Sequence, residues 1–483
     1  MGLPPGELHR LTHIDYIKKL KCCKISFAGL NIKVIYGATT YPLTAEGYTA
    51  EDCLFKLALL CLTRRKMATN KSAFRRADYL KITVFGFALA ALWGGLHTII
   101  IPARLLDLVP LSEKSTYLGL LTFAGLMLAI IVQPIAGAIS DRSGFAWGRR
   151  RPFILGGTLV AMLFLAGIGW VGSFLALFVI YCLLQIASNT TQGPYQAFIP
   201  DLVPVGKRGL ASGVKGFLEI AGGVALLYPI AIFMDRYSAS EGLWLWLSLA
   251  MLGAALLAAV AITILTVRER PGRGGARPPL SATIYQSFKI KGRAHRDFIW
   301  FIVSRLFIMM AFTTLQTFAM YFLMDVVGVP DPAAATARFS TVAIAGMLIV
   351  AYPAGRLSDR IGRRPIALAA GLLGAVGIAL IFLSGQNLTL IMLCGGLVGI
   401  AFGAFISSNW ALATDLVPKG EEARYLGLTN LATAGGAALA RLIGPLIDFG
   451  NSYSPNLGYS IMFLACFIYF IVGSLLLLKI RRR

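Results

Sequence analysis

Apolar runs long enough to form a membrane-spanning helix recur twelve times along this sequence. A helix needs about 20 apolar residues to cross the roughly 30 Å hydrocarbon core of a bilayer, and each run meets that length. The composition agrees, because 57% of the residues are hydrophobic and only 14% are charged. An all-α membrane protein is therefore predicted. The expected spans are about 82–103, 117–139, 153–172, 174–199, 209–234, 243–266, 298–323, 338–355, 366–384, 389–414, 425–447 and 459–478.

Basic residues lie mostly on one side of the predicted bundle. The loops and ends on that side carry 28 Lys and Arg residues, whereas the opposite loops carry four, Arg104, Lys114, Arg236 and Arg338. Because basic loops stay in the cytoplasm, both ends of the bundle are expected there. A net charge of +23 would otherwise favour nucleic acid as a partner, but topology accounts for most of it. The expected surroundings are the lipid bilayer of the cell membrane, with no nucleic acid.

An internal repeat divides most of the chain into two halves. The loop that ends at Pro152 returns at Pro365, and Asp201-Leu-Val-Pro returns at Asp415, with offsets that agree to within one position. Two landmarks with one spacing indicate a duplicated six-helix unit. The segment before this unit lacks a span and is expected to be a disordered extension, with Met67 as an alternative initiator. The expected domains are the extension 1–70, the N-terminal half 71–266, a cytoplasmic linker 267–297 and the C-terminal half 298–483.

Two of these motifs resemble the major facilitator superfamily. Residues Gly355–Arg364 read GRLSDRIGRR, similar to the family loop between spans 2 and 3. The longer first copy, with extra residues 143–147, and the span-4 segment 187–197 resemble the branch that contains sucrose–proton symporters. The resemblance implies a monomeric carrier of a small molecule, without enzymatic activity or cofactor. The chain departs from the plant members at Gln185, where they carry a proton-exchanging aspartate, and at Gln196, where the pattern has arginine.

Four amides form a stripe on one face of span 4. Gln185, Asn189, Gln192 and Gln196 follow the spacing i, i+4, i+7 and i+11, which places them on one side of a helix. Amides in hydrocarbon need partners, so the stripe must face other helices or a water-filled cavity. The stripe has two interpretations: its amides form hydrogen bonds between helices, or they contact a solute. Amides donate and accept, so a bound solute is expected to be rich in hydroxyl groups.

Other embedded polar residues extend the set of candidate solute contacts. Trp93 and His97 share a face of span 1, and Arg305 and Gln316 share a face of span 7, where Arg305 can also snorkel to the cytoplasmic end. Packing alone is the alternative for each. The candidate solute-binding residues are Trp93, His97, Gln185, Asn189, Gln192, Gln196, Arg305 and Gln316.

Glu219 is the one acid deep inside an apolar run, on span 5. A carboxyl that binds a proton on one side of the membrane and releases it on the other suits proton coupling. An ion pair with Lys215, one turn away, is the structural alternative. Near the outer end of span 11, Arg441 lies seven residues before Asp448, and an interhelical or outer-gate ion pair is the simplest explanation of these charges.

The two repeated loops supply candidate gate residues. Each pairs an aspartate at the cytoplasmic end of a helix with arginines, and the family resemblance places each aspartate near the N-terminus of a helix in its own half. A carboxylate there can hold an arginine while the inner face is closed. Charges that only set the topology are the alternative. The candidate gate residues are Asp141, Arg142, Arg149, Arg150, Asp359, Arg360 and Arg363.

Motifs of other functional classes are missing from the sequence. It contains no GxxxxGK[ST] phosphate loop, no HExxH zinc motif and no GxSxG nucleophile turn, so neither an enzyme nor a metal site is expected. The favoured function is secondary active transport of a small polar solute, a sugar or glycoside, by alternating access with proton coupling. The alternatives are proton-linked efflux of an amphipathic compound and, from a different class, a membrane receptor that transports nothing.

Overall fold

The computed structural model divides the chain into two units, Met1–Phe74 and Arg75–Arg483. It describes residues 24–28, 31–36, 39–44, 75–237, 242–269, 296–417 and 422–480. In the first unit, three strands form an antiparallel sheet in the order β1-β2-β3. Their bounds are Lys24–Ala28, Asn31–Tyr36 and Thr39–Thr44.

These strands differ from the disordered extension expected for residues 1–70. Apolar Ile32 and Val34 alternate with polar Asn31 and Lys33, and a period of two residues fits a strand. Such short alternation carries little weight in a sequence dominated by long apolar runs. The other residues of that expectation, including Met67, lie outside the described residues.

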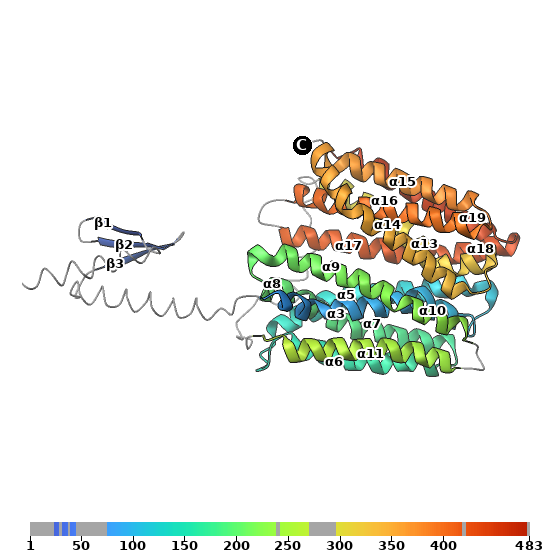
Figure 1. The fold of residues 1–483 in the computed structure, drawn as a ribbon, viewed down its shortest axis with the longest axis horizontal. Helices are drawn as coiled ribbons and strands as arrows, with labels where there is room; N and C mark the ends of the chain where they lie inside the picture. The colour runs from blue at the N-terminus through green and yellow to red at the C-terminus, as the bar shows by residue number, and fades with distance from the viewer. Residues whose placement is uncertain are drawn as a thin grey trace, which may run out of the picture. The chain divides into compact units, whose positions relative to one another are not determined.

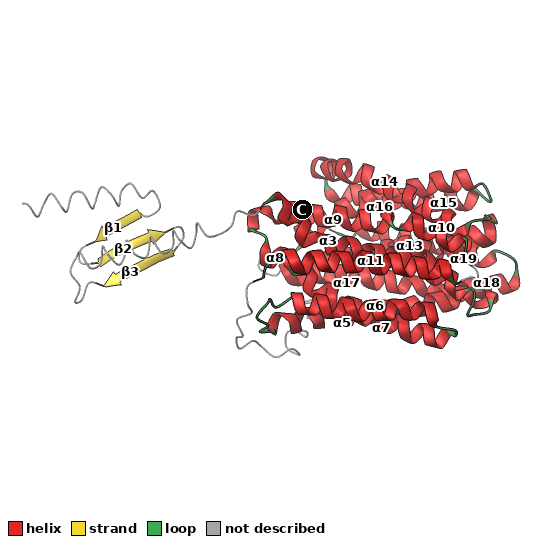
Figure 2. Ribbon diagram, turned by 60° about the horizontal axis from the view of Figure 1, so that its bottom comes forward, coloured by secondary structure: helices red, strands yellow, loops and turns green. Residues whose placement is uncertain are grey.

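The described residues of the second unit contain twelve helices that are long and apolar enough to cross a membrane, as predicted. The helices run side by side (Figure 1), and the loops gather at the two ends (Figure 2). The helices of the N-terminal half are α3 Arg76–Gly95, α4 Ile101–Leu105, α5 Lys114–Arg142, α6 Arg151–Trp170, α7 Phe174–Gln196, α8 Phe198–Leu202, α9 Arg208–Ala225, α10 Leu227–Asp235 and α11 Leu243–Thr266. Those of the C-terminal half are α13 Arg296–Phe322, α14 Pro332–Ile361, α15 Arg363–Leu383, α16 Leu388–Leu416, α17 Glu422–Ala440, α18 Gly444–Tyr453 and α19 Leu457–Leu477.

Short turns of another helical type interrupt two of the spans and end a third. The π-helical turn η1, Leu96–Ile100, joins α3 to α4, and a second one, η4, Leu323–Val327, follows α13. A 3-10 turn, η5, Arg441–Ile443, joins α17 to α18. Turns of this kind inside a helix often mark functional positions, because they change the direction in which side chains point.

The same helix pairs pack together in both halves. In the N-terminal half α5 packs on α7, α6 on α7 and α3 on α9, and in the C-terminal half α14 packs on α16, α15 on α16 and α13 on α17. These are equivalent pairs under the sequence repeat, so the predicted architecture of two six-helix halves is confirmed. The halves meet where α5 packs against η5 and α18, and where α10 packs against α14.

Candidate functional site

A chain of hydrogen bonds joins η1 to α7 next to the seam between the halves. His97 Nε2 hydrogen-bonds to the Tyr181 hydroxyl at 2.8 Å, and Gln185 Nε2 donates to the same hydroxyl at 2.8 Å. Asn189 Nδ2 then donates to Gln185 Oε1 at 3.1 Å, and Trp93 stacks on His97 with ring centroids 4.9 Å apart. The structure thus brings four predicted residues together. Tyr181 was not predicted, although it lies one turn before Gln185 on the same face.

The amide stripe continues along α7 beyond these hydrogen bonds, with Gln192 and Gln196. Gln185 and Asn189 are buried, Gln192 is half-buried, and Gln196, the last residue of the helix, is exposed. The stripe therefore passes from a buried polar cluster towards the other end of the bundle.

Arg305 is held inside the C-terminal half. Only 1% of the residue is exposed, its Nε donates to Thr433 Oγ1 at 2.9 Å, and Nη1 donates to the Asn409 side chain. The guanidinium also lies 4.9 Å from the centre of the Trp410 ring. The side chain therefore does not snorkel to the cytoplasmic end, because these partners satisfy it within the bundle. Gln316 is exposed and lines a small pocket between α13, α14 and α16.

Glu219 and Lys215 form the ion pair that their spacing suggests. Lys215 Nζ lies 3.3 Å from Glu219 Oε1, and the two side chains are 22% and 38% exposed. Glu219 also lies against Gly86 of α3, and the Lys215 ammonium lies 5.7 Å from the centre of the Tyr195 ring. The carboxyl is therefore paired yet partly accessible, and its role in proton coupling stays a prediction.

Polar contacts join the two halves at one end of the bundle, which we call the closed end. Lys114 Nζ, at the start of α5, lies 2.6 Å from Asp325 Oδ1 in η4. The Tyr459 hydroxyl donates to the other oxygen of Asp325 at 2.5 Å, and the Tyr321 hydroxyl donates to the Pro102 carbonyl at 2.9 Å. Each half thus supplies partners to the other at this end.

Asp448 closes the seam by accepting hydrogen bonds from the backbone of the opposite half. Its carboxylate accepts from the N–H groups of Ser115 at 3.3 Å and Thr116 at 2.6 Å, in the first turn of α5. A negative charge thus lies at the positive end of a helix dipole. Neither Arg441 nor Asp448 takes part in a salt bridge within the described residues, and the backbone of α5 occupies the Asp448 carboxylate instead.

Asp235 makes the equivalent contact from the N-terminal half to the backbone of the C-terminal half. At the end of α10, its carboxylate accepts from the N–H groups of Ala333 at 2.9 Å and Ala334 at 2.8 Å, in the first turn of α14. The offset from Asp235 to Asp448 equals the repeat offset found in the sequence, so the two acids occupy equivalent positions. Asp235 was not predicted, although the repeat register applied to Asp448 identifies it.

Two glycines allow the close approach of the halves beside Asp448. A Cβ atom at Gly444 would lie 2.2 Å from the Ser115 carbonyl oxygen, and one at Gly119 would lie 2.3 Å from the Arg441 carbonyl oxygen. Both distances are far below van der Waals contact and involve backbone atoms. The seam of α5 with η5 and α18 therefore requires glycine at these positions.

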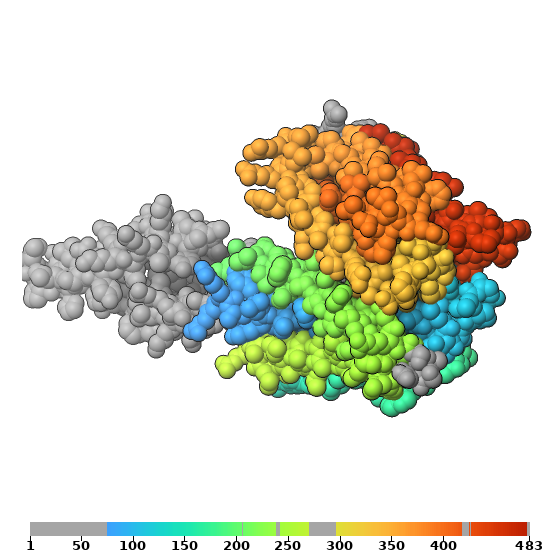
Figure 3. Space-filling model, turned by 45° about the vertical axis from the view of Figure 1, so that its right-hand side comes forward, coloured from blue at the N-terminus to red at the C-terminus, as the bar shows by residue number. Residues whose placement is uncertain are grey.

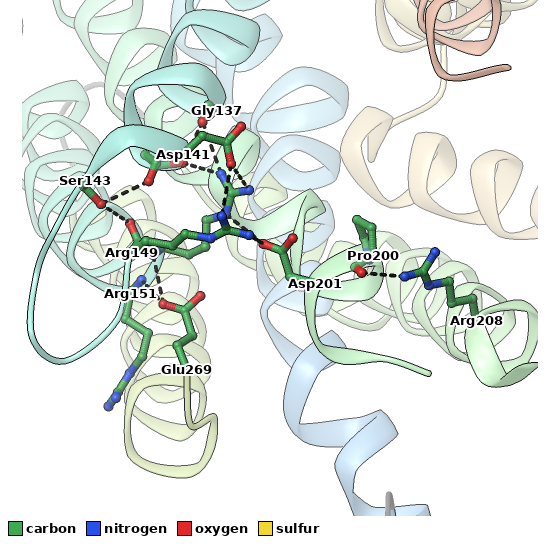
Figure 4. A network of polar contacts seen from close by, with 11 residues as sticks. Gly137, Asp141, Ser143, Arg149, Arg151, Pro200, Asp201, Arg208 and Glu269 are labelled. Atoms are coloured by element: carbon green, nitrogen blue, oxygen red, sulfur yellow. Dashed lines mark hydrogen bonds and ion pairs between the residues drawn. The ribbon is translucent and has the colours of Figure 1, made fainter. Parts of the chain in front are cut away.

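At the opposite end, arginines and aspartates form a network within the N-terminal half (Figure 4). Arg149 Nη2 lies 2.7 Å from Asp201 Oδ2, and Arg150 pairs with Asp141 and, through Nε at 3.1 Å, with Asp201. Glu269 accepts a hydrogen bond from the Arg150 backbone N–H at 2.9 Å. Burial raises the pKa of the Glu269 carboxyl, and this N–H group opposes the rise.

The C-terminal half repeats this arrangement with Arg363. Its Nη1 lies 2.6 Å from Asp415 Oδ1, and its Nη2 lies 3.6 Å from Asp359 Oδ1. Asp201 and Asp415 were not predicted as arginine partners, although their recurring Asp-Leu-Val-Pro segment marked the repeat. The remaining predicted gate residues, Arg142 and Arg360, have exposed side chains.

Hydrogen bonds and ion pairs between the halves occur, within the described residues, at the closed end alone. The ion pairs of Arg150 and Arg363 at the other end each stay within one half. There the two halves stand apart in the space-filling view (Figure 3), so we call it the open end. The described part of the chain holds no group of three His, Cys, Asp or Glu residues that could bind a metal ion.

Comparison with known proteins identifies relatives by sequence. The family described as MFS/sugar transport protein matches residues 84–479. Solute carrier family 45 member 4 of Mus musculus is 32% identical over 130 residues, which cover 24% of this chain and 16% of that protein. The minor myo-inositol transporter IolF of Bacillus subtilis is 32% identical over 92 residues, or 19% of this chain and 21% of that protein. Sucrose transport protein SUC4 of Arabidopsis thaliana is 30% identical over 108 residues, with the same shares. The chain thus spans only about a fifth of the length of these relatives.

Solved structures share the fold over most of the chain. The nucleoside transporter NupG superposes with a TM-score of 0.65 at 13% identity, covering 84% of this chain and 99% of that one. A D-xylose-proton symporter gives a TM-score of 0.63 at 15% identity, covering 84% and 98%. A bacterial homologue of the lysosomal transporter Spinster, in an inward-facing and unoccupied conformation, gives 0.60 at 18% identity, covering 86% and 100%. Because the family match covers most of the sequence, this chain belongs to the MFS/sugar transport protein family, and its twelve long apolar helices are those of a multi-pass membrane protein.

Proposed function

We propose that this transporter is a secondary carrier for a small polar solute, in particular a sugar or glycoside. The observation that carries the proposal is the buried chain of His97, Tyr181, Gln185 and Asn189 beside the seam between the halves. Amide groups both donate and accept hydrogen bonds, so they match the hydroxyl groups of a sugar. Relatives named for myo-inositol, sucrose and D-xylose support the same class of solute.

Transport proceeds by alternating access in this proposal. The halves are joined at the closed end and stand apart at the open end, so the polar chain is reached from one side at a time. Rocking one half against the other would break the closed-end contacts and bring the opposite ends together. The charge bias assigns the open end to the cytoplasm of the cell, which makes this conformation inward-open.

The orientation has a direct test in intact cells. A cysteine in place of exposed Arg338, at the closed end, should react with an impermeant maleimide, whereas one in place of exposed Arg356, at the open end, should react only after permeabilisation. The reverse pattern would invert the assignment.

Glu219 is proposed to couple transport to protons. Its carboxyl lies about 16 Å along the span that starts at Arg208, near the middle of the bilayer, at 1.5 Å of rise per residue. Lys215 balances its charge when the carboxyl is ionised and becomes the unpaired partner when it is protonated. This pair can therefore change its net charge by one during a transport cycle.

Uptake into proteoliposomes tests the proposed function. The purified full-length protein should take up sucrose, myo-inositol or xylose, and a pH gradient should increase the accumulation. Asn189→Leu should raise the KM for the transported sugar about tenfold, because it removes one buried hydrogen-bond partner. Thr190→Val, on a neighbouring face of α7, serves as the control and should leave the KM unchanged. A protein that moves no sugar under either condition would refute the proposal.

A further inference from the structure

Arg441 is a buried cation without an acidic partner among the described residues. The residue is 6% exposed, Nη1 donates to the Ala437 carbonyl, and Nε has no hydrogen-bond partner. Asp448, two turns further along the same span, is engaged with the backbone of α5. A guanidinium keeps its charge in proteins, and a buried charge is strongly unfavourable unless it is paired. This position therefore lacks one negative charge.

The unpaired guanidinium lies beside the polar chain of the candidate site. The turn η1, which carries His97, and the turn η5, which begins at Arg441, both pack against α13. Helix α5 contacts both Arg441 and the polar chain. Gly119 of α5 lies against the Arg441 backbone, and Gly125 lies against the side chains of Tyr181 and Gln185 on α7. These two glycines are about 9 Å apart along the helix, at 1.5 Å per residue. The C-terminal half thus adds a positive charge to amides and an imidazole from the N-terminal half.

The regular helix is interrupted at this site in both halves. His97 lies in the π-helical turn η1, and Arg441 begins the 3-10 turn η5. Broken helices with polar residues at the break are typical of solute sites between the halves of a carrier. The break in η5 has a local cause, because Pro445 lacks a backbone N–H and its ring crowds the carbonyl of Arg441, four residues earlier.

We infer that the transported solute is an anionic sugar or glycoside whose carboxylate or phosphate pairs with Arg441. This inference rests on the proposed function and specifies its substrate class. With Nη1 bound to the Ala437 carbonyl, the opposite edge of the guanidinium, Nε with Nη2, can donate two parallel hydrogen bonds to an oxyanion. The sugar hydroxyls then contact His97, Gln185 and Asn189. Such a solute binds both halves at once.

The inference is tested by measuring solute exchange in proteoliposomes. Each neutral sugar is compared with two anionic forms of the same sugar ring. The probes are D-glucose, D-glucuronate and D-glucose 6-phosphate, together with D-galactose, D-galacturonate and D-galactose 6-phosphate. The wild type should exchange one anionic form with much higher affinity than the neutral sugar of the same ring. The anionic form that exchanges distinguishes a carboxylate from a phosphate ester. Inorganic phosphate and acetate, added as competitors, should compete only weakly.

Variants of Arg441 give the decisive comparison. Arg441→Gln should weaken binding of the anionic probe at least about 30-fold and leave the neutral sugar unchanged, because only the anion loses its partner. Arg441→Lys keeps the charge but not the two parallel donors, so a smaller loss is expected for the anion alone. Arg338→Gln makes the same charge change on an exposed residue and should alter neither affinity. If Arg441→Gln fails to fold, as judged by size-exclusion chromatography, the ratio of anionic to neutral affinity in Arg441→Lys decides.

The outcomes separate this inference from the proposed function. Equal binding of neutral and anionic probes, or an anion affinity that Arg441→Gln leaves unchanged, overturns the inference while sugar transport stands. Failure of the wild type to bind or move any of the six probes overturns the inference, and failure to move sucrose, myo-inositol and xylose as well overturns the proposed function.

Discussion

Asp448→Asn is expected to open the closed end of this transporter. The carboxylate accepts two backbone hydrogen bonds at the N-terminus of α5, and the residue is 9% exposed. Asparagine keeps the size and one acceptor oxygen but loses the charge and the second acceptor. A hydrogen bond to a charged group contributes about 1.5–3 kcal/mol, and a charge at a helix end adds about 0.3–1 kcal/mol. A loss of about 2 kcal/mol would raise the ratio of molecules open at this end to molecules closed there about 30-fold.

A cysteine at Ser115 reports this opening. The residue is fully buried in the seam and its hydroxyl has no partner, so Ser115→Cys removes no hydrogen bond. An impermeant maleimide should modify this cysteine about 30-fold faster when Asp448→Asn is added, since the reagent enters only when the seam opens. The parent without the reporter corrects for the native cysteines.

The matched control is an acid at the same helix end that takes no part in the seam. Glu113 is exposed, and its side chain makes no capping hydrogen bond to α5. Glu113→Gln should therefore leave the modification rate unchanged. Asp235→Asn should reproduce the effect of Asp448→Asn through α14, because the two contacts are equivalent. Unchanged rates in both aspartate variants would refute the assignment of these acids to the seam.

Three further expectations follow from the same structure. Glu219→Gln should abolish uphill accumulation driven by a pH gradient yet keep exchange between equal pools in proteoliposomes, and accumulation that persists would exclude it as the coupling site. Asp359→Asn and Asp141→Asn each remove an ion pair that is already formed within one half at the open end, so they should leave the labelling of a cysteine placed inside the open end unchanged; faster labelling in both would support the gate role expected from the sequence. Gly444→Ala should speed the labelling of the Ser115→Cys reporter, because its Cβ would lie 2.2 Å from a backbone oxygen, and an unchanged rate would show that the seam can adjust.

The sequence predicts the helical architecture well because the signals are local. Each span is an apolar run of membrane length, and the repeat spacing from Pro152 to Pro365 fixes which spans are equivalent. The strands within 24–44 were missed because such short alternation is weak evidence beside runs of membrane length. The interruptions η1 and η5 were also missed, because Gly and Pro occur in many of the spans and do not single out these two turns.

The candidate site was predictable only along single helices. Gln185 and Asn189 lie one turn apart on α7, so their contact follows from helical spacing, and the same holds for Trp93 and His97. The contacts of Asp448 with α5 join a side chain near the end of the chain to backbone N–H groups in the other half. Any residue type except proline supplies such an N–H group, so the partner leaves no trace in the sequence.

Span 11 links the proposed anion site at Arg441 to the closed end. It carries Arg441 in η5 and, two turns later on α18, Asp448, which holds the start of α5. Arg441 begins the 3-10 turn that leads directly into α18, so a shift of Arg441 towards a bound anion is expected to displace the start of α18. The seam around Gly119 and Gly444 has little room to absorb that displacement, because even a Cβ atom at either glycine would overlap a backbone oxygen of the other half. Binding of the solute at Arg441 is therefore expected to strain the Asp448 contacts and lower the free energy needed to open the closed end.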